Sequence, residues 1–493
     1  MRNITKIITL VISATAAITI NADTAKNDAK HQATVLAENW LSAQRDYKQF
    51  PGMSVAVIKD QEIIFSGAWG HSNAKNSAKA TTNTLYSICS NSKLFTSVAL
   101  MQLRDEGKVT LRDPVKKHLD WFSVIQKDTK SIPVTIEGLL THSSGLMREA
   151  TGFYWDGPDF PFPERQQVKE NIGKQEMLFA GSRHYQYSNI GLTLAGEIVE
   201  AVSGQNYHEY IRENVLSPLD MNDTYSSMPS KKYGKQLAIG YSAMKRDGKR
   251  DKVKLFDARA IDPAAGFASS VNDYAKFAKW QFRLLNDGGN EVLDHNTLRE
   301  MQRPHWVMDN WKSARGLGFG AYRINGDTYV GHGGSCPGYR SSFMLNPKTK
   351  TAVIVMINAN DVDTGDIAVK LHKIFADISA DSDSDSAKNE SSKSLPDPKK
   401  SPKFISADYS GIYEVLPWGK DSLILNWKGK LGVVDLGDND PLSNMTMLKH
   451  IEGDTFVRIR KDKSEAEKIF FERNKKGNVT KVNWHDFHLF KKG

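Results

Sequence analysis

Long apolar runs and cysteine are both scarce in this 493-residue chain. Beyond the first 22 residues, no segment is apolar enough to span a bilayer. Only two cysteines occur, and neither lies near the N-terminus, which excludes a lipid-modified cysteine there. Zinc-finger, RNA-binding and basic-helix patterns are missing, so the net charge of +9 does not predict a nucleic-acid partner. It indicates a solvated basic surface, which could also keep the protein near anionic polymers of a cell envelope.

The first 22 residues, MRNITKIITLVISATAAITINA, are typical of a secretory signal peptide. Arg2 and Lys6 form a short basic start, an apolar run follows from Ile7 to Ile20, and small residues lie near its end. The run is shorter than the roughly 20 residues that a membrane-spanning helix needs. We therefore expect a periplasmic or secreted protein that keeps no stable membrane span after cleavage. An uncleaved membrane anchor is the competing interpretation.

Strand-like segments lie at both ends of residues 23–379, and helical patterns lie between them. A hairpin is predicted at 50–70, helices at 92–107, 134–146, 188–204 and 270–289, and late strands in LGFGAYRI, TYVGHGG, YRSSFMLN and TAVIVMIN. This order predicts an α+β domain, in which one antiparallel sheet, closed by N- and C-terminal strands, packs against a helical lobe.

A polar segment, residues 380–402, separates this domain from a different pattern. It consists mainly of Ser, Asp, Lys and Pro, so it cannot offset its ordering entropy by burial and is predicted to be a disordered linker. From 403 to 493, short strand-like runs alternate with turns such as KGK and NKKGN, and no helical period appears. We expect a small all-β barrel or sandwich of about 90 residues.

The stretch YSICSNSKLFTSVALMQL, residues 86–103, contains the first candidate for chemistry. Ser90 and Lys93 are three residues apart, so on a helix they lie on the same face, one turn from each other. Serine is a weak nucleophile until a base takes its proton, and a lysine that burial keeps uncharged can be that base. The pair alone is a weak signal, because the same spacing recurs at residues 72–75 and 242–245.

Two further motifs follow in the chain. Tyr187 and Asn189, in HYQYSNIG, precede a helix. A phenol beside a lysine can pass on a proton, and an amide can hold a substrate carbonyl or amide. His332, Gly334 and Ser335 lie in YVGHGGSCPG, where glycines let a substrate approach the strand and the Ser335 N–H can help to hold an oxyanion. Taken singly, the two segments could be a turn before a helix and a glycine-rich turn with an incidental histidine.

In this order, the motifs S-x-x-K, Y-x-N and H-x-G resemble those of the serine β-lactamase and penicillin-binding-protein family. The resemblance is strongest to the class C branch and its relatives among D-Ala-D-Ala carboxypeptidases, D-aminopeptidases and esterases. It extends over roughly residues 35–378, through blocks such as PGMSVAVIKDQEIIFSGAWG, TIEGLLTHSSGL, YSNIGLTLAGEIVEAVSG and GHGGSCPGYRSSFMLNP. The C-terminal segment is similar to the accessory barrel attached to some of these hydrolases. The resemblance implies a β-lactamase-like fold followed by that barrel.

The resemblance also implies a role for each candidate residue. Ser90 would be the acylated nucleophile and Lys93 its base. Tyr187 would share the proton transfer and protonate the leaving group. Asn189 would bind the substrate amide, and Gly334 with Ser335 would belong to the substrate and oxyanion site.

The third motif departs from the family pattern. His332 takes the place of a lysine or histidine, where it would orient Tyr187 or supply positive charge, and an ordinary pKa of about 6.5 makes that charge unreliable. Gly333 replaces the threonine or serine common in β-lactamases, whose hydroxyl helps to grip a substrate carboxylate, so efficient β-lactam hydrolysis is not expected. His142, in LLTHSSG, is expected to pack or cap rather than to catalyse.

The two cysteines flank two of these motifs. If the first and third motifs face each other across one cleft, as the resemblance implies, Cys89 and Cys336 are neighbours, and an oxidising compartment would join them in a disulfide. A bridge at equivalent positions occurs in some class A β-lactamases. It would set the distance between the N–H groups of Ser90 and Ser335. Two free, buried cysteines are the alternative.

The sequence thus predicts an exported serine hydrolase that acts through an acyl-enzyme on amide or ester bonds, with no metal and no cofactor. The expected substrates are small molecules or peptides with D-amino acids, including cell-wall peptides, and small esters. A true β-lactamase is the alternative within the family. The alternative of another class is a non-catalytic, penicillin-binding-like recognition protein, and covalent labelling of Ser90 would separate the two.

Overall fold

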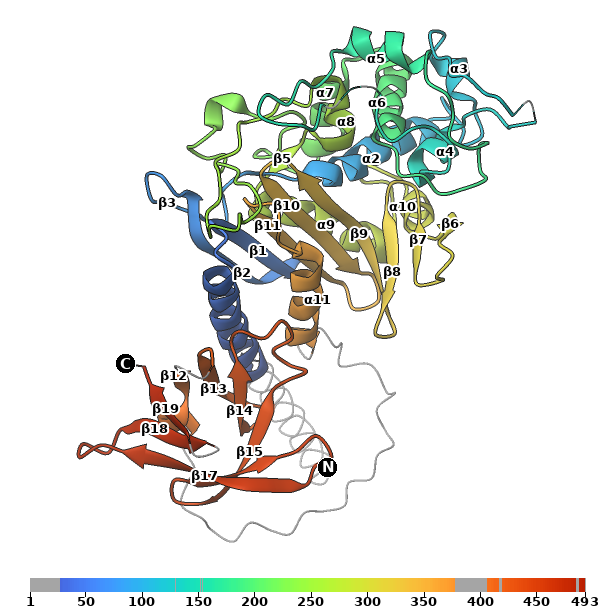
Figure 1. Ribbon diagram of the computed structural model, residues 1–493. Coiled ribbons are helices and arrows are strands. Elements are labelled where there is room, and N and C mark those ends of the chain that lie inside the picture. Colours follow the sequence, from blue (N-terminus) through green and yellow to red (C-terminus); the bar gives the residue numbers. More distant parts are fainter. Residues whose placement is uncertain are drawn as a thin grey trace, which may run out of the picture. The chain divides into compact units, whose positions relative to one another are not determined.

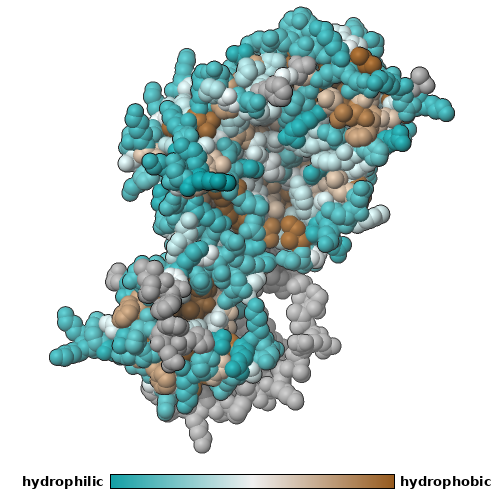
Figure 2. Space-filling view, viewed as in Figure 1, coloured by the Kyte–Doolittle hydropathy of each residue, from teal (hydrophilic) through white to brown (hydrophobic). Residues whose placement is uncertain are grey.

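The computed structural model describes residues 27–376, apart from 129, 151 and 153, and residues 406–492, apart from 416–418, 485 and 486. The chain forms two compact units: one comprises Phe50–His372, and the other combines the chain before residue 50 with the chain from Lys373 onwards. The predicted signal peptide and the predicted linker lie outside the described residues. On the visible face, the surface is mainly hydrophilic, with small apolar areas (Figure 2).

A nine-stranded antiparallel sheet forms the centre of the Phe50–His372 unit (Figure 1). Its order is β3-β2-β1-β11-β10-β9-β8-β7-β6, so the first and last strands of the unit, β1 and β11, are hydrogen-bonded neighbours. This confirms the predicted sheet closed by N- and C-terminal strands. The strands are β1 (Gly52–Lys59), β2 (Glu62–Asn73), β3 (Ala78–Lys79), β6 (Trp306–Val307), β7 (Ser313–Arg315), β8 (Gly320–Ile324), β9 (Asp327–Cys336), β10 (Tyr339–Asn346) and β11 (Thr351–Ile357).

Two helices cover the sheet. Helix α9 (Val271–Asp287) follows the N-cap Ser270, packs on β1 and β11, and stacks its Tyr274 ring on Phe343 of β10. On the opposite face lies α11 (Thr364–Ile374), as Figure 1 shows. Helix α10 (His295–Gln302) packs against α9.

The remaining helices form the predicted lobe at one end of the sheet (Figure 1). At its centre, α2 and α6 pack together, and both are buried along most of their length. A two-stranded ladder of β4 (Tyr86–Ser87) and β5 (Ala268–Ser269) lies where the chain enters the lobe. The lobe helices are α2 (Ser92–Asp105), α3 (Val115–His118), α4 (Ile136–Thr141), α5 (Arg165–Ile172), α6 (Asn189–Ser203), α7 (Tyr207–Ile211) and α8 (Asp262–Ala265).

The second unit contains a closed antiparallel barrel, which confirms the all-β prediction for the C-terminal segment. Side chains such as Tyr413, Ile424, Phe456 and Ile469 fill its apolar core. A one-turn helix, α13 (Ser406–Tyr409), precedes the first strand. The strands are β12 (Gly411–Glu414), β13 (Ser422–Trp427), β14 (Lys430–Asp435), β15 (Thr446–Glu452), β16 (Thr455–Ile459), β17 (Glu465–Arg473), β18 (Val479–Trp484) and β19 (Phe487–Lys491).

A helix over residues 27–48 belongs to the barrel unit. Its Trp40 Nε1 donates to the carbonyl oxygen of Asp438 (2.9 Å), and its Gln44 Nε2 donates to that of Leu436 (3.2 Å). The compact unit around the sheet begins at Phe50. The domain bounds 23–379 stay a prediction. Among the described residues, no helix is both long and apolar enough to cross a membrane.

Candidate active site

The segment before α2 presents the predicted nucleophile. Cys89–Asn91 is a short 3₁₀-helix, and α2 follows directly from Ser92. Cys89 has φ of 51°, in the left-handed region that non-glycine residues rarely adopt. After this turn, Ser90 lines a cavity of about 650 Å³.

Lys93 is fully buried, one helical turn after this serine. Its Nζ donates to Asn189 Oδ1 (2.8 Å) and to the carbonyl oxygen of Ala264 (2.8 Å). Burial lowers the pKa of Lys93 well below 10.5, and the Glu149 carboxylate partly opposes this. An uncharged amine has two N–H groups and one lone pair. Because protein oxygens accept both N–H groups, the lone pair stays available to accept a proton.

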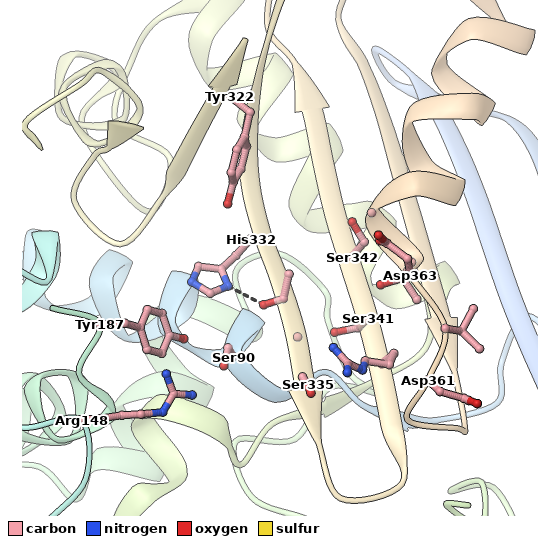
Figure 3. A pocket seen from close by; sticks show the side chains of 16 residues that line it. Ser90, Arg148, Tyr187, Tyr322, His332, Ser335, Ser341, Ser342, Asp361 and Asp363 are labelled. Atoms are coloured by element: carbon pink, nitrogen blue, oxygen red, sulfur yellow. Dashed lines mark hydrogen bonds between the residues drawn. The ribbon is translucent and has the colours of Figure 1, made fainter. Parts of the chain in front are cut away.

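Tyr187 lies against both residues. Its ring centre is 4.9 Å from Lys93 Nζ, and its hydroxyl points toward Ser90 (Figure 3). Burial raises the pKa of Tyr187 above its ordinary value of 10, and the nearby Ser90 side chain acts in the opposite direction. The phenol therefore keeps its proton at neutral pH and can donate it.

His142 packs against the Tyr187 ring. The two ring centroids are 4.3 Å apart, and His142 Nδ1 accepts the backbone N–H of Ser188 (3.1 Å). His142 itself ends α4 in the left-handed conformation. Burial lowers its pKa well below 6.5, and Lys93, when protonated, lowers it further. His142 thus packs and caps, as expected from the sequence.

Asn189 begins α6 and is only 2% exposed. Its Oδ1 accepts from Lys93, and its Nδ2 donates to Glu149 Oε1 (2.6 Å). Glu149 also accepts a hydrogen bond from the Tyr154 hydroxyl. Because a carboxylate accepts and an ammonium or amine donates, these partners fix which end of the amide faces the lysine. The contact that the structure assigns to Asn189 is with Lys93, and binding of a substrate amide stays a prediction.

His332 lies on β9, beside the Tyr187 ring, with 6.2 Å between ring centroids. Its Nδ1–H donates to the carbonyl oxygen of Gly333 (2.6 Å), so Nε2 carries the lone pair. Burial lowers the pKa of His332 to about 3, and Lys93, when protonated, and Arg315 lower it further. His332 is therefore neutral at neutral pH, which leaves orientation and hydrogen bonding, not positive charge, as its contribution.

Strand β9 lies directly against the nucleophile segment. A Cβ at Gly334 would stand 2.3 Å from the carbonyl oxygen of Ile88 and 3.1 Å from Cys89 Cβ, so only glycine permits this approach. β8 pairs with β9 only as far as Gly331, so the residues of β9 from His332 onwards have no hydrogen bonds to β8. Ser335, in that segment, lines the same cavity as Ser90.

The predicted disulfide is present between Cys89 and Cys336, whose Cα atoms are 5.6 Å apart. The bridge joins the residue before Ser90 to the residue after Ser335, and both cysteines are buried. It therefore ties together the two segments whose N–H groups are predicted to hold an oxyanion.

Figure 3 shows how these side chains converge. Tyr187 and His332 point toward Ser90, and Arg148 stands beside Tyr187. The Arg148 guanidinium lies 4.8 Å from the centre of the Tyr187 ring. On the other side, Tyr322 lines the cavity and accepts a hydrogen bond from Arg315 (3.1 Å).

The structure brings all the predicted site residues into one region, and their catalytic roles stay predictions. Sequence reasoning missed Glu149, Arg148 and the Arg315–Tyr322 pair. Glu149 lies seven residues after His142 in a loop without a recognisable motif, and only the fold shows that its carboxylate reaches Asn189. In the part of the chain that the structure describes, no group of three or more His, Cys, Asp or Glu side chains is placed to hold a metal ion.

The fold and this cluster of serine, lysine and tyrosine define a β-lactamase-like hydrolase. The beta-lactamase family model matches residues 37–373, and the chain belongs to that family.

Three known proteins are similar to this chain. Protein flp of Staphylococcus aureus is 27% identical over 340 residues, which is 68% of this chain. The chain spans 64% of the length of that relative. The octameric penicillin-binding protein homologue of Pyrococcus abyssi has a TM-score of 0.62 at 23% identity, over 92% of this chain and 99% of its own. A D-stereospecific amidohydrolase of a Streptomyces species has a TM-score of 0.56 at 21% identity, over 66% of this chain and 94% of its own. The two structural likenesses concern the fold.

Proposed function

We propose that this protein is an exported serine hydrolase that cleaves amide or ester bonds through an acyl-enzyme on Ser90. The observation that carries the proposal is the environment of Lys93, which is buried, has a pKa that burial lowers well below 10.5, and donates to two protein oxygens. Because water does not hydrate such an amine, its lone pair is available to accept the serine proton. Tyr187, whose hydroxyl points toward Ser90, is the second proton-transfer partner.

In the first step, Ser90 Oγ attacks the substrate carbonyl and its proton passes to Lys93. The N–H groups of Ser90 and Ser335 hold the oxyanion that forms. As the intermediate collapses, the bond to the leaving group breaks and Tyr187 gives that group a proton, which Lys93 then restores. Water adds to the acyl-enzyme, the acid departs, and Ser90 recovers its proton.

Peptides with D-amino acids and small esters are the proposed substrates. A β-lactam needs its carboxylate to be held, and the third motif has a neutral His332 and no hydroxyl at Gly333. The likeness to a D-stereospecific amidohydrolase supports a peptide or amide. Export is supported by the signal-like N-terminus and by the disulfide, which persists in oxidising compartments.

A substrate panel tests the proposal, using D-amino acid peptides, p-nitrophenyl esters and a chromogenic cephalosporin. Ser90→Ala should lower kcat/KM for the best substrate by at least about 10³-fold. The matched control is Ser242→Ala, which alters one of the two other Ser-x-x-Lys pairs, with Ser242 half-buried and Lys245 exposed, and should change nothing. A folded wild-type protein that turns over none of the panel, and acquires no label on Ser90, would support the non-catalytic recognition protein instead.

A further inference from the structure

A second cavity, of about 360 Å³, adjoins the cavity of Ser90. We call it the side pocket, and it lies between α11 and strands β8, β9 and β10, within the Phe50–His372 unit. Six residues line both cavities, so the two spaces are continuous. The shared residues are Tyr322, His332, Gly333, Ser342, Asp363 and Gly365.

Two glycines of β9 leave the space that the side pocket occupies. Gly331 pairs with Met344 of β10 and Gly333 pairs with Ser342, so both glycines face the same side of the sheet. At Gly331 the backbone itself requires glycine, because a Cβ there would stand 1.9 Å from the carbonyl oxygen of Phe343.

Gly333 has no such constraint. Within 4 Å in the described part of the chain, a Cβ at this position would meet only the carbonyl oxygen of Ser341, at 4.0 Å. Packing therefore does not require a glycine here, and a larger side chain would project into the opening between the two cavities. The missing side chain at Gly333 joins the side pocket to the cavity of Ser90.

The inner lining of the side pocket is apolar and carries no positive charge. Ile324 of β8, Met344 of β10 and Val369 of α11 line the side pocket but not the cavity of Ser90. None of the residues that line the side pocket is a lysine or an arginine. The exposed carboxylate of Asp363, at the rim, would repel an anion. The side pocket therefore fits an uncharged apolar group and not a carboxylate.

Ser342 stands at the junction of the two cavities. It is 4% exposed, and no hydrogen bond joins its hydroxyl to another described residue. In Figure 3, Ser342 and Asp363 lie across β9 from Ser90 and Tyr187. The Ser342 hydroxyl is thus available to a polar group of a ligand that passes from one cavity into the other.

The leaving group of the proposed reaction lies on the side of the side pocket. In that reaction Tyr187 protonates the leaving group, and His332, beside Tyr187, lines both cavities. Ser335, the proposed oxyanion donor, lies further along β9 and lines the cavity of Ser90 but not the side pocket. A group that extends from the leaving atom past Gly333 therefore enters the side pocket.

We propose that the side pocket binds an apolar side chain on the leaving-group side of the scissile bond, and that Gly333 sets this specificity. The inference rests on the proposed hydrolase function and names its substrate class, which is peptides with an apolar residue after the scissile bond or esters of apolar alcohols. Ile324, Met344 and Val369 contact the apolar group, and Ser342 offers its hydroxyl to the polar atoms beside it.

Initial rates on 4-methylphenyl acetate and 4-butylphenyl acetate test the proposal. The two phenols are almost equally acidic, so the pair differs in apolar length and not in leaving ability. Phenyl acetate and phenyl hexanoate form the matched acyl-side pair. The variants are Val369→Phe, which fills the side pocket from α11, and Gly333→Val, which closes its opening. Val202→Phe, at a partly buried position of α6 that lines neither cavity, is the control, and melting curves verify that each variant folds.

In the wild type, kcat/KM should be at least about tenfold higher for the butyl than for the methyl ester. Val369→Phe and Gly333→Val should each reduce this ratio to below about threefold, whereas Val202→Phe should leave it unchanged. A ratio near one in the wild type, or a ratio that persists in both variants when folded, overturns the proposal. A gain that only the hexanoyl group produces also overturns it, because the side pocket would then lie on the acyl side.

Failure of the proposed function gives a separate result. Should no ester be hydrolysed, that function fails, and calorimetric titration with 4-butylphenol and 4-methylphenol decides the side pocket by itself. The butylphenol should bind at least about tenfold more tightly, and Val369→Phe should abolish the difference. Equal affinity for the two phenols, or an unchanged difference in Val369→Phe, overturns the subsite.

Discussion

The C-terminal barrel and the Phe50–His372 unit bury different kinds of side chain. Among the described residues of the barrel, 406–492, every buried side chain is hydrophobic or a tyrosine. The Phe50–His372 unit has a larger apolar core, but it also buries Lys93, Asn189, Asp262 and His332.

This difference separates side chains that serve folding stability from side chains that serve the proposed chemistry. An apolar core is stabilised by burial alone, whereas a buried ionisable group costs free energy unless it is paired or neutralised. The buried side chains of the barrel are apolar or tyrosine, as expected where burial serves folding stability alone. The sheet-and-lobe unit keeps costly polar groups together around Ser90, as expected where a protein gives up stability for chemistry.

Lys93→Met should have the largest effect, because it should lower catalytic activity and raise folding stability. The substitution removes the proposed base, so acylation of Ser90 should fall by about 10²- to 10⁴-fold. It also removes an amine that must lose its proton on folding, so the free energy of unfolding at neutral pH should rise. Esterase assays and chemical denaturation measure the two effects.

The sign of the stability effect follows from proton binding. Between the lowered pKa in the folded protein and the ordinary value of 10.5, the unfolded chain holds a proton on Lys93 that the folded chain lacks. Stability from this group therefore rises with pH, by up to about 1.4 kcal/mol per unit. Lys93→Met should lose that slope, and the exposed control Lys75→Met should keep it. An unchanged slope in Lys93→Met would show that Lys93 is charged in the fold.

Phe456→Ala tests the barrel side of the comparison. Phe456 is 1% exposed in the barrel core, and truncation of a buried phenylalanine costs about 3–5 kcal/mol. Barrel unfolding should shift to lower denaturant, while kcat/KM stays within about twofold because every site residue lies in the other unit. Phe470→Ala, at a position 45% exposed, is the control. A large loss of activity in folded Phe456→Ala would mean that the barrel takes part in the chemistry.

Removal of the disulfide should lower both the folding stability and the rate of acylation. Cys89 and Cys336 are 247 residues apart, and loss of a native bridge typically costs about 2–5 kcal/mol. The double change to Ala should also slow acylation by about tenfold, because Cys89 then no longer holds its left-handed turn before Ser90. The double change to Ser, which keeps the side-chain volume, should behave alike. Lower stability with unchanged acylation would leave the bridge purely structural.

Of these variants, Glu149→Gln should change activity least, and the change in its pH profile should show how Glu149 acts. The charge of Glu149 raises the pKa of Lys93, so its removal lowers that pKa further. The acid limb of the kcat/KM profile should shift to lower pH, with a loss of roughly three- to tenfold at the optimum. Glu176→Gln, a half-exposed carboxylate paired with Lys127, is the control. A profile that keeps its acid limb would contradict a role for Glu149 through Asn189 and Lys93.

Much of this arrangement could be predicted from the sequence. Apolar periodicity, caps such as Ser270 and turn residues specify local structure, so the hairpin, the main helices and the barrel strands were found. The order of the three motifs led to Ser90, Lys93 and Tyr187, and the flanking cysteines led to the Cys89–Cys336 bridge.

The remainder depends on contacts between distant residues without a local signal. Glu149 reaches Asn189 only because two loops meet at the start of α6. The neutrality of His332 comes from burial and from neighbouring cations, neither of which its sequence context reveals. The helix over residues 27–48 has an ordinary apolar face, and nothing in that face tells which unit it joins.

Mass-spectrometric mapping of a fluorophosphonate adduct tests the central claim, that buried, uncharged Lys93 activates Ser90. The account predicts one adduct, on Ser90, that is absent from Ser90→Ala and forms at least about 10²-fold more slowly in Lys93→Met. A folded wild-type protein that acquires no adduct, that is labelled at another residue, or that reacts equally fast without the Lys93 amine would contradict it.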